Sequence, residues 1–415
     1  MDFSKIRISN AYYILVALGY VLTLVFADMR PGVFGAFLMI LVLGELILKK
    51  EVKINCTADA IAIIYFAYQI LSVIWLLAGG FPFSVFIEEF VSSTLPMVFY
   101  FVGRSSGKNG AKWFMTYIIA IMLLGIIGVV FYITAPDFYC RWAYDWGYIS
   151  KPDAATMRVR MHSVIGSTCL SFISVAGMLA GSYFLTGHGD EEKSGTKKRT
   201  VIFAVAATAL SLLFAIMANQ RSGLVAAALV IIYINYLLFF KLDMIPRKFF
   251  IYEVIAIAAV FALICAVKFE FILKFWYRII SLPTAISQRS EQWVAAVNNM
   301  YSSWIGNGLG ANGHKALGIE DAHVIADGGL VKLYCENGVI GFSLWVYLLF
   351  LALSDGAKNI RERYAEAGII AVAVLQSIGS NMLAFQICAP VFWFAVGRCI
   401  SCDRARDIIP RFRNK

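Results

Sequence analysis

Apolar segments about as long as a bilayer is thick recur along nearly the whole chain, separated by short polar stretches. A helix of about 20 apolar residues crosses a bilayer and pairs its own backbone groups inside the lipid. Hydrophobic residues make up 60% of the chain and charged residues only 15%. Soluble domains carry about 25% charged residues. The sequence therefore predicts an all-α polytopic membrane protein, with residues 1–415 forming a single integral membrane domain.

The segment lengths predict about twelve transmembrane helices. They lie near residues 11–28, 31–48, 57–78, 83–103, 113–134, 164–186, 200–217, 222–240, 249–267, 329–353, 365–385 and 386–400. The first segment has no small-residue cleavage site and continues into Asp28, Arg30 and Pro31. We therefore expect it to be a retained span and not a signal peptide.

Positive charges fall in alternate loops. They are Lys5 and Arg7; Lys49, Lys50 and Lys53; Arg104, Lys108 and Lys112; Lys197, Lys198 and Arg199; Lys241, Arg247 and Lys248; Arg361 and Arg363; and Arg404, Arg406, Arg411 and Arg413. The positive-inside rule assigns these loops to the cytoplasm, so we expect a multi-pass protein of the bacterial cytoplasmic (inner) membrane with both termini cytoplasmic. The net charge of +10 then reflects orientation in the lipid bilayer and not binding of nucleic acid.

Two longer polar segments, residues 135–163 and 268–328, fall on the predicted outer side. The second is too long for a simple connection, and loops of that length are usually functional. It carries Trp276, Tyr277, Trp293, Tyr301 and Trp304 at spacings typical of amphipathic helices on a membrane surface. We therefore expect a large external, periplasmic loop that contains short amphipathic helices and carries the chemistry.

The sequence gives no sign of a metal or cofactor. The 8 cysteines fall mostly in predicted spans, which does not favour a disulfide framework. Cys399 and Cys402 have no companion ligands, and no HExxH motif or Cys/His cluster occurs. We therefore predict neither metal nor cofactor.

Three arginines fall at the predicted outer face. Arg221 lies in the turn Ala218-Asn219-Gln220-Arg221-Ser222-Gly223, and Arg278 and Arg289 lie in the large loop. A guanidinium donates two parallel hydrogen bonds to phosphate oxygens and never deprotonates. The alternatives are a snorkelling anchor for Arg221, an interface anchor for Arg278 and a solvated charge for Arg289. Arg221 is a positive charge on the predicted outer side, where the positive-inside rule expects few. This exception favours a specific role for Arg221.

The same loop holds a glycine-rich run, Gly306-Asn307-Gly308-Leu309-Gly310-Ala311-Asn312-Gly313. Gly308 and Gly310 permit positive φ and close approach of backbone amides to a ligand, although a flexible turn would use the same residues.

Two of the chain's 4 histidines, His314 and His323, lie in this loop. A neutral histidine can act as a general base on a hydroxyl. In a helix, Asp327 at i+4 could orient the His323 imidazole. The alternative is a solvated surface histidine.

Charged residues also occur near the predicted membrane edge. Lys332 and Glu336 lie one helical turn apart, where a paired charge is more often structural than catalytic. Glu88 and Glu89 could line an aqueous cavity.

Two runs in the second half of the chain resemble a family signature. They are Trp304-Ile305-Gly306-Asn307-Gly308-Leu309-Gly310, followed by a histidine, and Tyr334-Cys335-Glu336-Asn337-Gly338-Val339-Ile340-Gly341. They resemble the signature of the O-antigen ligase and Wzy-type polymerase superfamily. The Gln220–Gly223 turn and the Arg289–Trp293 segment look like that family's two external arginine motifs, in the same order. By motif the resemblance covers roughly residues 200 to 355.

The resemblance implies a GT-C-like fold and a metal-independent glycosyltransferase that uses a polyprenyl-diphosphate-linked glycan donor. Arg221 and Arg289 would hold undecaprenyl diphosphate, and His323 would activate or orient the acceptor hydroxyl. Val324 follows His323 where the family often has asparagine, so His314 stays an alternative. Arg278, His314, Asp327, Gly308 and Gly310 would complete the substrate-binding surface. Positioned arginines can stabilise the charge of a diphosphate leaving group.

Three functions remain open at this stage. The first is polymerisation of undecaprenyl-diphosphate-linked repeat units into O-antigen, capsule or exopolysaccharide, with a chain-length regulator and a flippase as partners. The second is an O-antigen ligase that transfers lipid-linked glycan to lipid A core or protein. The third is a lipid-linked oligosaccharide flippase or transporter, for which broken or ionisable spans around a midplane site are typical. Concentration of polar residues in one external loop favours surface chemistry.

Overall fold

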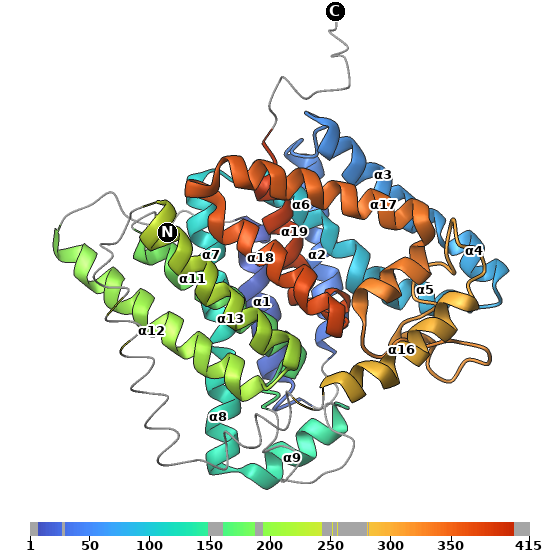
Figure 1. Ribbon diagram of the computed structural model, residues 1–415, viewed down its shortest axis with the longest axis horizontal. Coiled ribbons are helices and arrows are strands. Elements are labelled where there is room, and N and C mark those ends of the chain that lie inside the picture. The colour runs from blue at the N-terminus through green and yellow to red at the C-terminus, as the bar shows by residue number, and fades with distance from the viewer. Residues whose placement is uncertain are drawn as a thin grey trace, which may run out of the picture.

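A computed structural model describes residues 7–26, 30–147, 161–186, 194–242, 251, 255, 280 and 282–401. These residues form helices and connecting turns, with no strand among them (Figure 1). The helices are α1 (Ile8–Leu22), α2 (Pro31–Leu48), α3 (Thr57–Leu71), α4 (Val73–Ala78), α5 (Phe83–Glu89), the π-helix η2 (Phe90–Thr94), the 3-10 helix η3 (Leu95–Met97), α6 (Val98–Ser105), α7 (Lys108–Met122), α8 (Leu124–Thr134), α9 (Pro136–Asp145), α11 (Ser167–Leu185), α12 (Ser194–Ala218), α13 (Arg221–Asn235), the π-helix η4 (Tyr236–Lys241), α16 (Leu282–Asn298), the 3-10 helix η5 (His314–Ala316), α17 (Gly329–Lys358), α18 (Ile360–Gly379), the 3-10 helix η6 (Met382–Ala384) and α19 (Cys388–Cys399).

Within the described residues, 7 helical segments are long and apolar enough to cross a membrane. They are Pro31–Leu48, Thr57–Ala78, Phe83–Ser105, Gly110–Thr134, Ser167–Leu185, Arg221–Lys241 and Gly329–Lys358. Shorter apolar helices are Ile8–Leu22, Ile202–Ala218 and Cys388–Cys399. The prediction of an α-helical, multi-pass membrane protein is confirmed. The span predicted near 249–267 and Arg278 lie outside the described residues, apart from residues 251 and 255 of that span.

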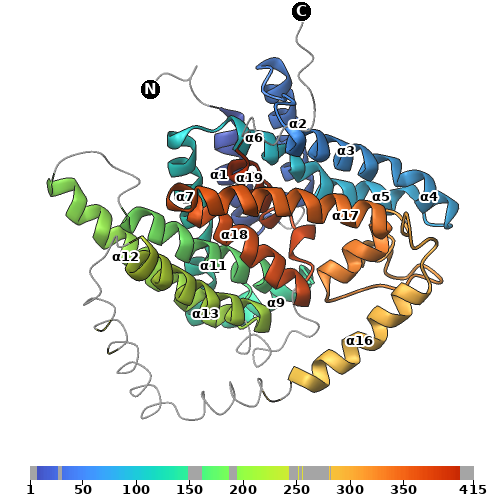
Figure 2. The same ribbon diagram turned by 45° about the horizontal axis from the view of Figure 1, so that its top comes forward.

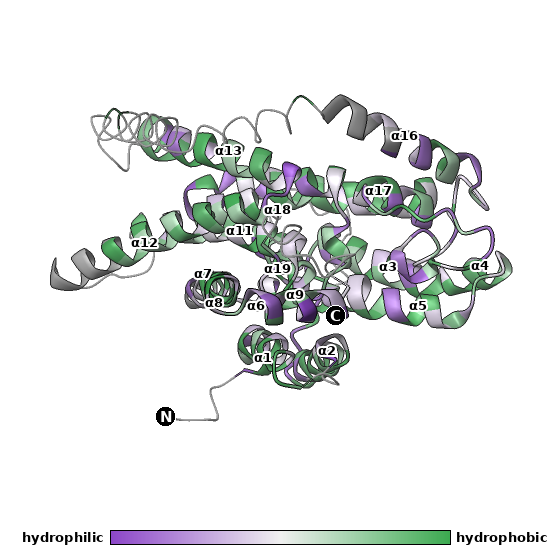
Figure 3. Cartoon of the chain, turned by 90° about the horizontal axis from the view of Figure 1, so that it is seen from below, coloured by the Kyte–Doolittle hydropathy of each residue, from purple (hydrophilic) through white to green (hydrophobic). Residues whose placement is uncertain are grey.

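The outward faces of these helices are apolar, as lipid contact requires. On α2, Val33, Phe37 and Ile40 are exposed, whereas Met39 and Val42 are buried against other helices. Figure 3 shows hydrophobic residues along most helices, with many of the hydrophilic residues at helix ends and in the connecting segments. A soluble protein rarely exposes so continuous an apolar surface.

α11 is the most deeply buried of these seven spans, with 89% of its apolar window inside. Gly177 and Gly181 face Ser211 and Thr208 of α12, and a Cβ at either glycine would overlap those hydroxyls. Small residues at a helix contact let two backbones approach closely, which is how membrane helices associate. α11 therefore fixes the α12–α13 hairpin against the rest of the fold.

Three segments within the bundle are interrupted. Between α5 and α6 the chain forms η2 and η3, where Pro96 lacks the N–H that an α-helix needs. α17 is kinked at Gly338. The continuous span predicted for 365–385 is wrong: α18 ends at Gly379, Ser380 is extended, and α19 starts only at Cys388.

One end of the bundle, called here the basic end, holds the described parts of the loops that the positive-inside rule assigned to the cytoplasm. Ion pairs join the helix ends there, Arg7 with Glu51 at 2.6 Å, Arg104 with Asp59 at 2.8 Å and Arg398 with Glu366 at 3.6 Å. These arginines thus also have a structural use, because they fasten neighbouring helices to one another.

The opposite end, called here the loop end, is formed by residues 79–82, 219–220, 299–328 and 380–387. Figures 1 and 2 both show the α12–α13 turn, the end of α18 and the start of α16 near one another at this end. α9 and α16 supply helices within the two segments predicted to be external.

Candidate functional site

The loop that contains the glycine-rich run packs against α17 at the kink in that helix. Gly338 adopts φ 58° and ψ −169°, outside helical values. The N–H groups of Val339 and Ile340 donate to the carbonyls of Ser303 and Trp304, at 2.9 and 3.0 Å. In an unbroken helix they would donate four residues back, to Cys335 and Glu336.

The two carbonyls freed by the kink are also paired. The Cys335 carbonyl accepts from the Asn307 N–H at 2.8 Å, and the Glu336 carbonyl accepts from the Gly308 N–H at 3.0 Å. The Ser303–Gly308 segment thus replaces both helical hydrogen bonds with bonds to itself. Because unpaired backbone groups are costly inside a membrane protein, this exchange is what permits the kink.

Glycines make this insertion sterically feasible. Gly306 has φ 78°, and a Cβ there would overlap the Glu336 carbonyl. A Cβ at Gly338 would overlap Trp304 in turn. The two runs that resemble the family signature therefore meet in space and pack on each other.

Gly308 and Gly310 also have positive φ, 91° and 92°. A Cβ at Gly308 would lie 2.6 Å from the Leu76 Cβ, and one at Gly310 would lie 2.9 Å from the Val85 carbonyl. The close approach expected of these glycines is therefore an approach to the protein's own helices α4 and α5. Both glycines are buried.

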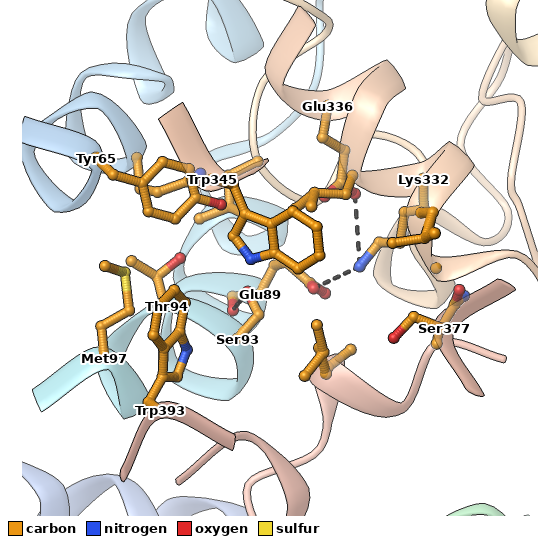
Figure 4. A pocket seen from close by; sticks show the side chains of 18 residues that line it. Tyr65, Glu89, Ser93, Thr94, Met97, Lys332, Glu336, Trp345, Ser377 and Trp393 are labelled. Carbon is orange, nitrogen blue, oxygen red and sulfur yellow. Dashed lines mark hydrogen bonds and ion pairs between the residues drawn. The ribbon is translucent and has the colours of Figure 1, made fainter. Parts of the chain in front are cut away.

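A buried charged cluster lies beneath the glycine-rich turn. Lys332 Nζ is 2.5 Å from Glu89 Oε1 and 3.6 Å from Glu336 Oε1 (Figure 4). The three side chains are 7%, 3% and 3% exposed. A lone charge at such depth costs several kcal/mol, so each of these charges needs its partner. The sequence indicated the Lys332–Glu336 pair and placed Glu89 at a cavity, but nothing in it joined Glu89 to Lys332.

A small cavity of about 60 Å³ adjoins this cluster. Tyr65, Trp345 and Trp393 contribute aromatic walls (Figure 4). Gln69 Oε1 and Asn381 Oδ1 are buried without a hydrogen-bond partner among the described residues, and both side chains line the cavity. A polar cavity of this size has room for a few water molecules.

A larger cavity of about 460 Å³ opens at the loop end. It is lined by Gly79, Gly80, Phe81, Asn299, Tyr301, Asn307, Asn312, Ile319, Glu320, Asp321 and His323. We call it the outer cavity. His323 is half-buried at its wall, whereas His314 lies exposed in η5 and is not among the lining residues. The structure therefore separates the two candidate histidines.

Asp327 does not orient His323. Residues 323–327 form no helix, so the expected i+4 relationship does not exist. Asp327 instead accepts a hydrogen bond from Arg289 Nη2 at 2.6 Å, and Trp293 Nε1 donates to the Asp327 carbonyl at 2.8 Å. Asp327 thus fixes the guanidinium of Arg289, whose side chain is 32% exposed.

Arg221 is the first residue of α13 and is half-buried. The preceding Gln220 donates from Nε2 to Ser167 Oγ at 2.9 Å and to Thr168 Oγ1 at 3.3 Å. These bonds hold the α12–α13 turn against the start of α11. Arg221 therefore lies on a fixed turn.

The break between α18 and α19 connects this turn with the Arg289 segment. A Cβ at Gly379 would lie 3.5 Å from the Ser222 Cβ, so the end of α18 lies beside the turn. Asn381 Nδ2 donates to the carbonyls of Ile325 and Ala326 at 2.7 and 3.2 Å. The α12–α13 turn and the segment that holds Asp327 thus contact the same short break.

No family model matches the chain, and no curated protein sequence matches it. Among the described residues, no group of three or more His, Cys, Asp or Glu side chains is arranged to hold a metal ion. The resemblance stated from the motifs therefore stays a prediction.

Proposed function

We propose that the protein is a polysaccharide polymerase, a glycosyltransferase that joins undecaprenyl-diphosphate-linked repeat units at the outer face of the bacterial cytoplasmic membrane. One observation carries the proposal. A single segment, residues 323–327, places His323 at the outer cavity and binds Arg289 through Asp327. A hydroxyl-activating group and a phosphate-binding group are thereby supported by one piece of backbone.

The donor diphosphate is assigned to Arg289 and Arg221. A guanidinium has five N–H donors, and Asp327 accepts from Nη2. The remaining donors can bind phosphate oxygens as charge develops on the leaving group. Arg221 stands at the positive end of the α13 dipole, which adds to the attraction for an anion.

The acceptor sugar is assigned to the outer cavity. Its volume of about 460 Å³ falls in the range of small-molecule sites, and its walls offer amides, carboxylates and aromatic rings. In the transfer, the neutral His323 imidazole takes the proton of the acceptor hydroxyl. The acceptor oxygen forms the new glycosidic bond as the bond between sugar and diphosphate breaks, and undecaprenyl diphosphate leaves with the electron pair.

The proposal fixes the orientation as well. The basic end faces the cytoplasm, together with both termini, and the loop end faces the periplasm. The about twelve spans expected from the sequence would form a GT-C-like membrane domain. A chain-length regulator and a flippase are the proposed partners.

The test is the length distribution of surface glycan in cells that lack the protein, compared with cells restored with wild type or Arg289→Ala. Single repeat units on their final carrier in the null strain and in the variant support the polymerase. Polymer that accumulates on undecaprenyl diphosphate and never reaches the carrier would instead identify the ligase.

A second candidate, transport of lipid-linked oligosaccharide, is favoured by one observation. Interruptions at 90–97, at Gly338 and at 380–387 adjoin a buried charged cluster, an arrangement typical of transporters. Against it, the adjoining cavity of about 60 Å³ is far smaller than an oligosaccharide. Purified protein in liposomes separates the candidates: a transporter moves labelled lipid-linked units across the bilayer without joining them.

A further inference from the structure

The cluster of Glu89, Lys332 and Glu336 does not line the outer cavity, yet it contacts the turn that builds that cavity. Gly313 lies directly over it, since a Cβ there would be 3.1 Å from Lys332 Nζ. The backbone N–H of Asn312 donates to Glu336 Oε1 at 3.4 Å. The cluster therefore supports the turn from below.

Asn312 connects the supported turn to the His323 segment through hydrogen bonds. It is 1% exposed, and its Nδ2 donates to the His323 carbonyl at 2.8 Å. Its own carbonyl accepts from the Ile325 N–H at 2.9 Å. Asn307 Nδ2 donates to its Oδ1 at 2.9 Å. Asn312 thus holds the His323 segment through its side chain on one side and its backbone on the other.

We propose that Glu336 is a positioning residue for the transfer reaction, acting through Asn312 on His323, and that Lys332 and Glu89 hold Glu336 in place. This inference rests on the proposed function. A carboxylate accepts directional hydrogen bonds, and Lys332 fixes its direction because it is bound to Glu89 at 2.5 Å. A fully paired buried network specifies one arrangement, which an apolar contact would not.

The expected effect falls on the chemical step. A general base must lie within hydrogen-bond reach of its proton, and a displacement of about 1 Å costs roughly a hundredfold in rate. Donor binding is assigned to Arg289 and Arg221, which the cluster does not contact in the described residues. Loss of Glu336 should therefore lower kcat and leave the donor KM unchanged.

The experiment uses the full-length protein in lipid nanodiscs with purified undecaprenyl-diphosphate-linked repeat unit. Glu336→Gln keeps an oxygen that can accept from Asn312, so we expect kcat to fall about tenfold or less. Glu336→Leu removes that acceptor, so kcat should fall roughly a hundredfold with the donor KM within about twofold. Both variants leave Glu89 and Lys332 as a neutral pair. A higher kcat in Glu336→Gln than in Glu336→Leu would show that the hydrogen-bond acceptor matters, and not only the volume of the side chain.

Two further variants keep the test decisive. Glu88→Gln changes the neighbouring carboxylate, which is exposed and pairs with Lys315 at 3.1 Å, and it should show wild-type kcat. Asn312→Ala removes the side-chain bond to the His323 carbonyl, keeps the backbone bond to Ile325 and alters no buried charge, so it should lower kcat while the protein stays folded. Wild-type kcat in folded Glu336→Leu and Asn312→Ala, or a raised donor KM at unchanged kcat, would overturn the inference. If wild-type protein itself joins no units, the proposed function fails, and the inference fails with it.

Discussion

Gly306 and Gly338 pack backbone against backbone, one in the loop that precedes α17 and the other at the kink of α17. A side chain on either would overlap the other segment. Both have positive φ, 78° and 58°. The pair holds the site together, because the hydrogen-bond exchange between loop and helix depends on this contact.

Substitution of either glycine should destabilise the protein. Gly338→Ala and Gly306→Ala each combine a strained positive φ, worth about 1–2 kcal/mol, with overlap worth about 1–3 kcal/mol. Thermal unfolding in detergent should show a clear fall in midpoint for both. Gly44→Ala in α2 is the matched control, because a Cβ there meets nothing within 4 Å. A midpoint for Gly338→Ala equal to that of the control would contradict the tight packing.

Removal of either arginine should abolish polymerisation and leave membrane insertion intact. Arg289→Ala and Arg221→Ala each remove proposed phosphate donors, and loss of one such donor typically costs about 10²–10³ in kcat. Gel analysis of lipid-linked products measures the loss, and protease protection of the loops measures insertion. Normal polymer from either variant would show that its proposed role is wrong.

Asp327→Asn should be milder than Arg289→Ala. The amide still accepts a hydrogen bond from Arg289 but loses the charge that strengthens it, and such charge assistance is worth about 1 kcal/mol. We expect a fall in activity of roughly fivefold to tenfold in the same product assay. Equal loss in Asp327→Asn and Arg289→Ala would mean that the carboxylate has a role of its own.

The two histidines should behave differently. His323→Ala should lose activity severely, because it removes the proposed base at the outer cavity, and general-base catalysis contributes about 10²–10⁴. His314→Ala should retain activity, because His314 is exposed in η5 away from the residues that line that cavity. Measured turnover of both variants decides the assignment. The reverse outcome would move the role to His314.

At the basic end, Asp59→Ala should destabilise the fold without altering the chemistry. Asp59 accepts from Arg104 Nε at 2.8 Å and from the Tyr100 hydroxyl at 2.8 Å, and its side chain is 1% exposed. Removal of one partner of a buried ion pair costs about 3–5 kcal/mol. The unfolding midpoint should fall, whereas turnover per folded molecule should stay at the wild-type value. A selective loss of turnover would place Asp59 in the reaction.

Much of the fold could be predicted because apolar length and local charge determine it. The predicted span 31–48 coincides with α2, and 57–78 coincides with α3 and α4 together. Segment length and positive charge are local properties, so the sequence displays them directly. The end of α18 was missed although Gly379, Ser380 and Asn381 are residue types that commonly end a helix, because the apolar residues on both sides suggested one continuous span.

The sequence named candidate residues for the site, but it did not predict the contacts between them. Arg289, Asp327 and His323 were all named as candidates, but Asp327 was assigned to the wrong partner, because that assignment assumed a helix. Glu89 and Lys332 are separated by 243 residues, and only the folded arrangement of the chain brings them together. Pairings of this kind depend on how spans assemble, which spacing along one chain does not encode.

The kink in α17 also bears on the order of biogenesis. Residues 303–308 leave the ribosome before α17 does, so the segment that pairs with the open turn of that helix is already synthesised when the helix enters the bilayer. A span that opened without this segment would leave two carbonyls and two N–H groups unpaired in lipid. The order of the two motifs along the chain therefore allows the translocon to release α17 directly into its kinked form.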